Sequence, residues 1–136
     1  MKDRVEKAVE LFKSGYNCSQ SVVAAFADMY GFTQEQALRM SASFGGGIGR
    51  MRQTCGAACG MFLLAGLEKG AVDGKDREGK AANYALVQQL AEEFRKRNGS
   101  MICAELLGLK KPEGSSTPEA RTEQYYACLL YTSPSP

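Results

Sequence analysis

Histidine and tryptophan are both absent from this chain of 136 residues. Histidine is the side chain that most often serves as a general base near neutral pH and as a nitrogen ligand of metals, so neither role is filled in the usual way. Haem attachment through Cys-x-x-Cys-His is not available, and only methionine or thiolate ligation of haem stays formally open. The chain does contain five cysteines. We therefore expect its chemistry to depend on sulfur.

Strong charge and long apolar runs are also lacking. The formal net charge is only +2 and no basic run is interleaved with aromatic residues, so we expect no nucleic-acid partner. The longest apolar stretch, residues 61–67, is far shorter than the roughly 20 residues of a membrane span. Five of the first seven residues are charged, and no apolar signal segment follows them. These features predict a cytoplasmic protein without membrane insertion. Thiols are kept reduced in the cytoplasm, so an odd number of cysteines indicates metal binding or redox activity rather than a disulfide framework.

The apolar residues recur at helical spacing, and no segment shows the alternation typical of a strand. The sequence predicts an all-α fold: one domain over residues 1–128, a bundle of about six to seven helices in which glycine ends most helices. The expected helices are 3–13, 18–30, 34–44, 55–69, 77–97, 101–107 and 118–128. The apolar stripe of the fifth helix is Tyr84, Val87, Leu90, Ala91 and Phe94. Residues 129–136 lack a helix cap, and we interpret them as a non-native or disordered tail.

Three of the cysteines fall in the first turn of an expected helix: Cys18, Cys55 and Cys103. Each follows a residue suited to cap that helix, namely Asn17, Thr54 or Ser100. The partial positive charge of a helix N-terminus stabilises a thiolate and lowers the pKa of the thiol. Thiolates are the nucleophilic and metal-binding form, so this placement favours reactivity. The alternative is that each cysteine is a small buried hydrophobic residue.

Cys55 and Cys59 lie four residues apart and therefore share one helix face. Their α-carbons would be about 6 Å apart with nearly parallel side chains, which suits a shared metal or cluster better than a disulfide. The simpler interpretation is that one of the two is the reactive residue and the other packs beside it.

A glycine-rich run, residues 45–49, precedes this helix. We identify Gly46, Gly47 and Gly56 as candidate cofactor-binding positions, because glycine lets the backbone approach a bound group closely. A flexible loop between helices is the alternative. The run lacks the lysine and the serine or threonine of a phosphate loop, so we expect no nucleotide.

Several segments together carry a family resemblance. They are residues 15–20 (GYNCSQ), the glycine run, residues 55–60 (CGAACG), Phe94, residues 98–100, Cys103, residues 106–108 and Cys128. With these segments the chain resembles, over residues 1–128, the family of redox-active proteins named C_GCAxxG_C_C for its cysteine pattern. The resemblance implies that the four cysteines of the family are Cys18, Cys55, Cys103 and Cys128. It implies a packing role for Cys59, and it gives a pattern rather than a reaction.

Three functions remain open. In the first, Cys18, Cys55, Cys103 and Cys128 bind an iron–sulfur cluster or another metal for electron transfer, with zinc ranked below iron–sulfur. In the second, a thiolate such as Cys55 attacks a disulfide and a second cysteine resolves the product; Cys55 and Cys18 are the candidate catalytic residues. The third is a structural or partner-binding helical domain with incidental thiols. We rank the first narrowly above the second. An unidentified redox protein is the expected partner, and a homodimer stays open.

Overall fold

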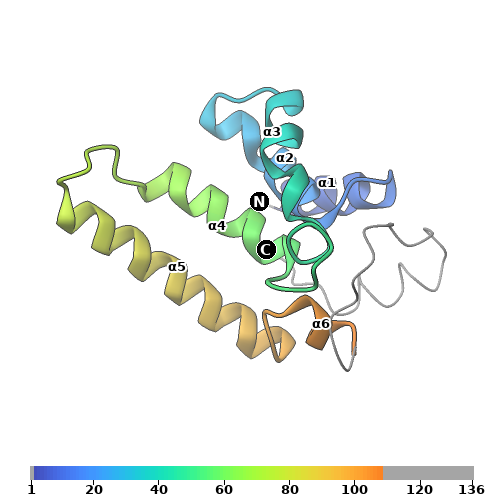
Figure 1. Ribbon diagram of the computed structural model, residues 1–136. Coiled ribbons are helices and arrows are strands. Elements are labelled where there is room, and N and C mark those ends of the chain that lie inside the picture. The colour runs from blue at the N-terminus through green and yellow to red at the C-terminus, as the bar shows by residue number, and fades with distance from the viewer. Residues whose placement is uncertain (1, 109–136) are drawn as a thin grey trace.

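The computed structural model describes residues 2–108, and this part of the chain folds into helices without a β-strand (Figure 1). Six α-helices and two 3-10 helices follow one another in this order: α1 (Lys2–Lys13), α2 (Cys18–Phe26), η1 (Ala27–Tyr30), α3 (Gln34–Ser41), η2 (Ala42–Phe44), α4 (Gly56–Lys69), α5 (Arg77–Asn98) and α6 (Cys103–Leu106). The all-α prediction is confirmed. The expected helix at residues 118–128, Cys128 and the tail lie outside the described residues.

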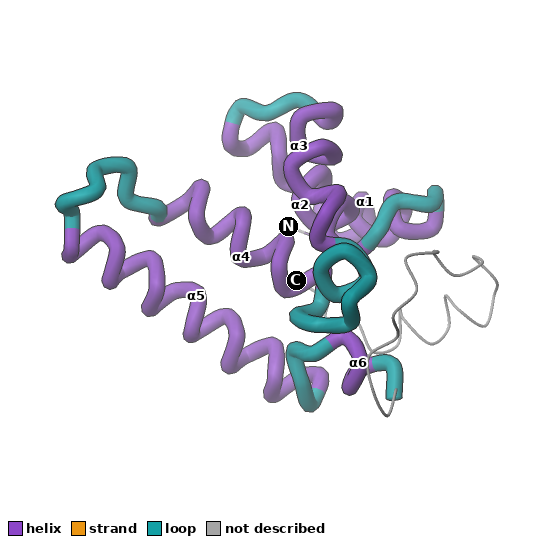
Figure 2. Tube along the Cα trace, in the orientation of Figure 1, coloured by secondary structure: helices purple, strands orange, loops and turns teal. Residues whose placement is uncertain are grey.

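Helix α2 lies at the centre of the arrangement and packs against α1, α3 and α4. Helix α5 runs back along α4, so the two form a hairpin that extends away from α1, α2 and α3 (Figure 2). The short α6 lies near the first turn of α4, at the end of the hairpin that faces the other helices. One buried cluster between α2 and α3 consists of Val23, Ala24, Ala27 and Ala37. Alanine-rich contacts bring helix axes close together, which tightens the packing around α2.

Local capping signals set most helix ends as expected. Asn17 and Thr33 each form a capping box with the glutamine three residues later, Gln20 or Gln36. Gly31 ends η1 and Gly99 ends α5, both with positive φ. The predicted helices 18–30 and 34–44 change to 3-10 geometry in their last turns, where α2 gives way to η1 and α3 to η2.

The Asn17 cap allows a stability prediction, because its side chain has two functions. Its Oδ1 accepts a hydrogen bond from the Gln20 amide at 2.8 Å, and its Nδ2 donates one to the Ala42 carbonyl at 3.0 Å. We expect Asn17→Ala to lower the free energy of unfolding by about 2 kcal/mol, because a cap and a contact between α2 and η2 are lost together. Thr33→Ala is the matched control: Thr33 caps only α3, and its loss should cost about 1 kcal/mol. Urea unfolding of both variants measures the difference, and equal losses would contradict the second role.

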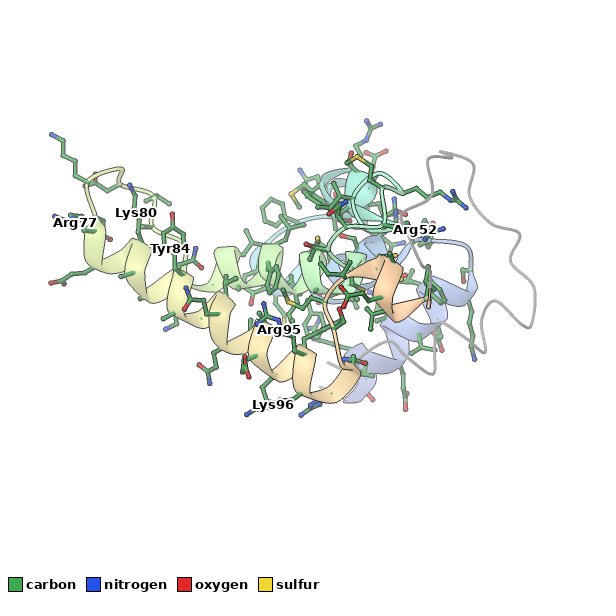
Figure 3. The ribbon with its side chains drawn as sticks, turned by 60° about the horizontal axis from the view of Figure 1, so that its bottom comes forward. Arg52, Arg77, Lys80, Tyr84, Arg95 and Lys96 are labelled. Carbon is green, nitrogen blue, oxygen red and sulfur yellow. The ribbon has the colours of Figure 1, made fainter. Side chains whose placement is uncertain are left out.

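The apolar stripe predicted for the fifth helix is only partly buried. Ala91 and Phe94 are buried, whereas Tyr84 is 60% exposed, so the prediction was wrong for Tyr84. Figure 3 shows Tyr84 near the loop end of α5, together with Arg77 and Lys80. Helix α5 packs on α4, and Phe94 belongs to the cluster at the start of α4. Among the described residues, no helix is both long and apolar enough to cross a membrane.

Candidate functional site

Two segments far apart in sequence pair through their backbones just before α4 and α6. Thr54 and Ile102 form an isolated antiparallel bridge. The Cys55 amide donates to the Met101 carbonyl at 2.7 Å, and the Cys103 amide donates to the Gln53 carbonyl at 2.6 Å. We refer to residues 52–55 and 101–104 as the paired segment.

This pairing moves two of the expected helix starts. Helix α4 begins at Gly56, and Cys55, rather than Thr54, is its N-cap. Helix α6 begins at Cys103 rather than at residue 101. Residues 101 and 102 make backbone contacts across the paired segment, so they cannot also lie in a helix. The predicted caps at Thr54 and Ser100 were therefore wrong, although the Ser100 hydroxyl does accept a hydrogen bond from the Ile102 amide.

The register of the pairing brings two cysteines to the same face. Thr54 is opposite Ile102, so Cys55 is opposite Met101, and Cys103 lies two residues after Met101 in the same segment. Residues at such diagonal positions point to the same side, with α-carbons about 7–8 Å apart and β-carbons closer. The electrostatic influence of Cys103 on the pKa of Cys55 agrees with this proximity. The paired segment thus brings Cys55 and Cys103 together.

The loop before the paired segment coils in a left-handed sense. Six of its residues have positive φ: Gly46, Gly47, Ile48, Gly49, Arg50 and Arg52. Backbone hydrogen bonds fold it on itself, with the amides of Arg52 and Gln53 donating to the carbonyls of Gly46 and Gly47. Positive φ is costly for a branched residue such as Ile48, so the surrounding contacts must hold this conformation.

Gly47 is the glycine at which the loop meets the cysteines. A β-carbon at this position would lie 2.6 Å from the β-carbon of Cys103. Gly56 also allows a close approach of backbone segments, at the start of α4. A β-carbon added at Gly56 would lie 2.9 Å from the Phe44 carbonyl oxygen and 3.3 Å from the Ser19 amide nitrogen. For Gly46, the nearest atom would be the α-carbon of Arg50. The three glycines proposed as cofactor-binding positions therefore allow close backbone packing, and cofactor binding by them remains a prediction.

Sequence reasoning missed Arg52. Its side chain is only 3% exposed, and its Nη1 donates a hydrogen bond to the Cys103 sulfur at 3.5 Å. Arginine is almost never this buried unless its charge has partners. Figure 3 shows Arg52 beside α6 and the first turn of α4. The one signal in the sequence was its position between a glycine-rich loop and a cysteine, which is too weak to identify a buried cation.

Cys18 approaches the same region from α2. It is half-buried and packs against the cluster formed by Cys55, Ala57, Ala58 and Phe94. The first turns of α2 and α4 meet closely here, since Ser19 lies against Gly56 and Gly60. The sequence-predicted residues Cys18, Cys55 and Cys103 thus border one region. Cys128 lies outside the described residues.

The electrostatic environment differs from the one predicted for a helix start. Burial raises the pKa of Cys55, and this effect outweighs the lowering by the Ala58 and Ala57 backbone amides at the start of α4. The prediction that the helix start lowers the pKa of this thiol was therefore wrong, because Cys55 is only 8% exposed. Burial, and then the nearby Cys55, raise the pKa of Cys59 to about 11.

The high pKa of Cys59 predicts slow alkylation. With a pKa of about 11, only about one Cys59 thiol in a thousand is a thiolate at pH 8. We expect iodoacetamide to label Cys59 in the folded, reduced protein at least about tenfold more slowly than the half-buried Cys18. Peptide mass spectrometry after timed quenching measures both rates, and labelling in urea provides the unfolded reference. Similar rates for the two thiols in the folded protein would refute this.

Metal binding needs ligands that converge. Among residues 2–108, no three cysteine, aspartate or glutamate side chains gather in a group that could hold a metal ion. The described part of the expected ligand set, Cys18, Cys55 and Cys103, does not by itself form a metal site. A site built on this set would have to include Cys128.

The pattern of cysteines around these helix starts agrees with the comparison with known families. The model of a family described as "Putative redox-active protein (C_GCAxxG_C_C)" matches residues 16–134. The chain belongs to this family. The C_GCAxxG_C_C match includes all five cysteines and extends beyond Cys128 into the segment interpreted as a tail, whose origin stays a prediction. No curated protein and no solved structure matches the chain.

Proposed function

We propose that the protein is a thiol–disulfide redox protein whose reactive pair is Cys55 and Cys103. The observation that carries this proposal is the antiparallel pairing of residues 52–55 with 101–104, which puts both cysteines on one face. The pair differs from the expected pair of Cys55 and Cys18. Membership of the C_GCAxxG_C_C family supports a redox role.

The proposed reaction reduces a disulfide RSSR. One cysteine thiolate attacks a sulfur of RSSR, a mixed disulfide forms, and RS⁻ leaves. The second cysteine loses its proton and attacks the protein sulfur of the mixed disulfide, which releases the second RS⁻. The protein ends with a Cys55–Cys103 disulfide, having given up two electrons and two protons, and the partner becomes two RSH. The reverse sequence oxidises a dithiol.

Closing this disulfide requires a small movement. Diagonal residues of an antiparallel pair have α-carbons about 7–8 Å apart, whereas disulfide-bonded residues are usually less than about 6.8 Å apart. A shift of about 1 Å is therefore enough. Cys103 begins a helix of only four residues, and three backbone hydrogen bonds join residues 52–55 to 101–104. The paired residues must share this shift, because backbone hydrogen bonds join residues 52 and 53 to 103 and 104, and Leu106 of α6 packs against the cluster at the start of α4.

Redox titration of the full chain tests the proposal. The reduced protein is equilibrated anaerobically with mixtures of reduced and oxidised dithiothreitol, and its disulfides are mapped by mass spectrometry. We expect one two-electron transition that links Cys55 to Cys103 and is lost in Cys55→Ser and Cys103→Ser. Cys59→Ser is the matched control, since it lies one turn from Cys55 and should retain the transition. Free Cys55 and Cys103 across the whole range, or a different linked pair, would overturn the proposal.

An iron–sulfur cluster for electron transfer is the second candidate. Cys18 at the start of α2 packs against the cluster that contains Cys55, and Cys103 lies at the start of α6. These positions favour a cluster, because positive helix ends stabilise anionic ligands. When bound, such a cluster would accept and donate single electrons, held by these three thiolates and Cys128. Its weakness is that the three described cysteines do not gather as ligands.

Anaerobic expression separates the two candidates. Visible absorption and assays of iron, sulfide and zinc are recorded for the full chain and for serine variants of Cys18, Cys55, Cys103 and Cys128. If the protein is brown, contains iron and sulfide, and is bleached in all four variants, the thiol-exchange proposal is rejected in favour of the cluster. Colourless protein that completes the dithiothreitol transition supports thiol exchange. Protein with neither metal nor a redox-linked thiol change would support the structural role.

A further inference from the structure

We propose that Cys18 is the entry thiol of this protein: it attacks the incoming disulfide first and passes the oxidation to Cys55, which then forms the disulfide with Cys103. This inference rests on the proposed thiol–disulfide function and adds a third cysteine to its reactive pair. The pair expected from the sequence, Cys55 and Cys18, thereby becomes the first half of a relay that ends at Cys55 and Cys103.

The three cysteines differ in their access to solvent. Cys55 is 8% exposed and Cys103 is 9% exposed, so both are buried, whereas Cys18 is only half-buried. The rate of thiol–disulfide exchange depends on access of the attacking sulfur to the partner sulfur. A buried thiol gains that access only when part of the structure opens. An incoming disulfide therefore meets Cys18 before it can meet either residue of the buried pair.

Close packing covers both residues of the buried pair. The loop backbone lies against Cys103, since a β-carbon added at Gly47 would be 2.6 Å from the Cys103 β-carbon. Cys55 belongs to a buried cluster with Ala57, Ala58 and Phe94, one helix turn or more from the loop between α4 and α5. A partner disulfide that attacked this pair directly would have to displace the loop or open the cluster.

Helices α2 and α4 run in the same direction where they meet. A β-carbon added at Gly56 would lie 3.3 Å from the Ser19 amide nitrogen, and one added at Gly60 would lie 3.1 Å from the Ser19 carbonyl oxygen. The contact thus advances along both helices together. Cys18 comes directly before Ser19, and Cys55 comes directly before Gly56, so the two cysteines lie at the same end of this contact. Cys18 also packs against the cluster that contains Cys55.

Cys55 therefore has one partner cysteine on each side. The paired segment brings it to Cys103, and the parallel contact of α2 with α4 brings it to Cys18. A sulfur in this position can receive the oxidation from Cys18 and transfer it to Cys103. Neither Cys18 nor Cys103 has this double connection among the described contacts.

The relay consists of three exchange steps. The Cys18 thiolate attacks one sulfur of RSSR, a mixed disulfide forms on Cys18, and RS⁻ leaves. Cys55 loses its proton and attacks the Cys18 sulfur, which forms a Cys18–Cys55 disulfide and releases the second RS⁻. Cys103 loses its proton and attacks the Cys55 sulfur, and the Cys18 thiolate leaves. The protein again gives up two electrons and two protons, the partner becomes two RSH, and Cys18 is regenerated.

The first test separates the rate of oxidation from its equilibrium. Reduced full chain is mixed anaerobically with oxidised glutathione at pH 8, samples are quenched with acid, and the Cys55–Cys103 disulfide is quantified by peptide mass spectrometry. We expect Cys18→Ser to form this disulfide at least about tenfold more slowly, because attack must then wait for the buried pair to open. In the dithiothreitol titration the same variant should keep the natural midpoint, because Cys18 has the same form before and after the relay.

The matched control for Cys18→Ser is Cys59→Ser. Cys59 is buried and lies one turn from Cys55, and the relay does not use it. Its substitution should leave both the rate of oxidation and the midpoint unchanged. Urea unfolding shows whether each variant is folded.

The second test keeps Cys18 in place and removes the cysteines that follow it. Oxidised glutathione is added to reduced Cys55→Ser and to reduced Cys103→Ser, and the products are mapped over time. In Cys55→Ser we expect glutathione to accumulate on Cys18, because the thiol that resolves this mixed disulfide is missing. In Cys103→Ser we expect a Cys18–Cys55 disulfide, because the last step is blocked. These products stay informative even if Cys18→Ser does not fold.

The outcomes distinguish this inference from the proposed function. Oxidation of Cys18→Ser at the natural rate would overturn the entry role and leave the Cys55–Cys103 transition intact. Glutathione trapped first on any cysteine other than Cys18 in Cys55→Ser, or no Cys18–Cys55 disulfide in Cys103→Ser, would also overturn it. Trapping on Cys18 in a protein without any dithiothreitol transition would retain Cys18 as the thiol attacked first and reject the Cys55–Cys103 proposal.

Discussion

Gly47→Ala is expected to lower the free energy of unfolding by about 3 kcal/mol. The backbone at Gly47 has φ of 74°, and an added β-carbon would lie 2.6 Å from the Cys103 β-carbon and 2.8 Å from the Arg52 α-carbon. Neither neighbour can move alone, because backbone hydrogen bonds hold residues 52, 53 and 103 together. The methyl group must therefore push the left-handed loop away from the paired segment.

The control for this prediction is Gly49→Ala in the same loop. Gly49 also has positive φ, 58°, but an added β-carbon would come no closer than 3.9 Å to any atom, the Ser43 carbonyl oxygen. Its substitution carries the backbone strain without the clash and should cost about 1 kcal/mol. Urea unfolding gives both values. Equal losses of unfolding free energy in the two variants would mean that close contact with Cys103 does not contribute to the effect of Gly47→Ala.

Gly47→Ala should also change the chemistry of the site. If the loop is displaced, Cys103 loses the cover of Gly47 and its hydrogen bond from Arg52 at the same time. We expect the rate of Cys103 alkylation to change in Gly47→Ala and to stay unchanged in Gly49→Ala. Peptide mass spectrometry measures both rates. This links the stability of the loop to the reactivity of one thiol.

The helices of this protein were predictable because their signals are local. Asn17 with Gln20, and Thr33 with Gln36, lie within four residues of each other, and the glycines at 31 and 99 act on the helix that each one ends. Such signals depend on backbone geometry that neighbouring residues fix among themselves. The sequence therefore predicted an all-α fold and most helix bounds within a few residues.

The site was less predictable because its decisive contacts join distant residues. Thr54 and Ile102 are far apart in the chain, and their pairing replaced two predicted helix caps and brought Cys103 to Cys55. The burial that raises the pKa of Cys55 depends on packing, which helix-start reasoning does not include. Arg52 was missed because its inward direction follows from a positive φ that its residue type disfavours.

The glycine at the start of α4 carries the second large prediction. Gly56→Ala is expected to lower the free energy of unfolding by about 2 kcal/mol. An added β-carbon would lie 2.9 Å from the Phe44 carbonyl oxygen, 3.3 Å from the Ser19 amide nitrogen and 3.4 Å from the Gly45 α-carbon. All three neighbours are backbone atoms, so no side chain can rotate to relieve the contact. The start of α4 must therefore move away from Phe44 at the end of η2 and from Ser19 at the start of α2.

Gly66→Ala provides a control of opposite sign in the same helix. Nothing lies within 4 Å of the β-carbon that would be added at Gly66, and the position is inside α4. Alanine there should raise the free energy of unfolding by about 0.5–1 kcal/mol, because glycine weakens a helix interior. Urea unfolding of the two variants therefore measures contact separately from helix propensity. Stabilisation by both substitutions would show that α2 and α4 do not meet closely at Gly56, and Cys18 would then lie further from Cys55 than their shared cluster requires.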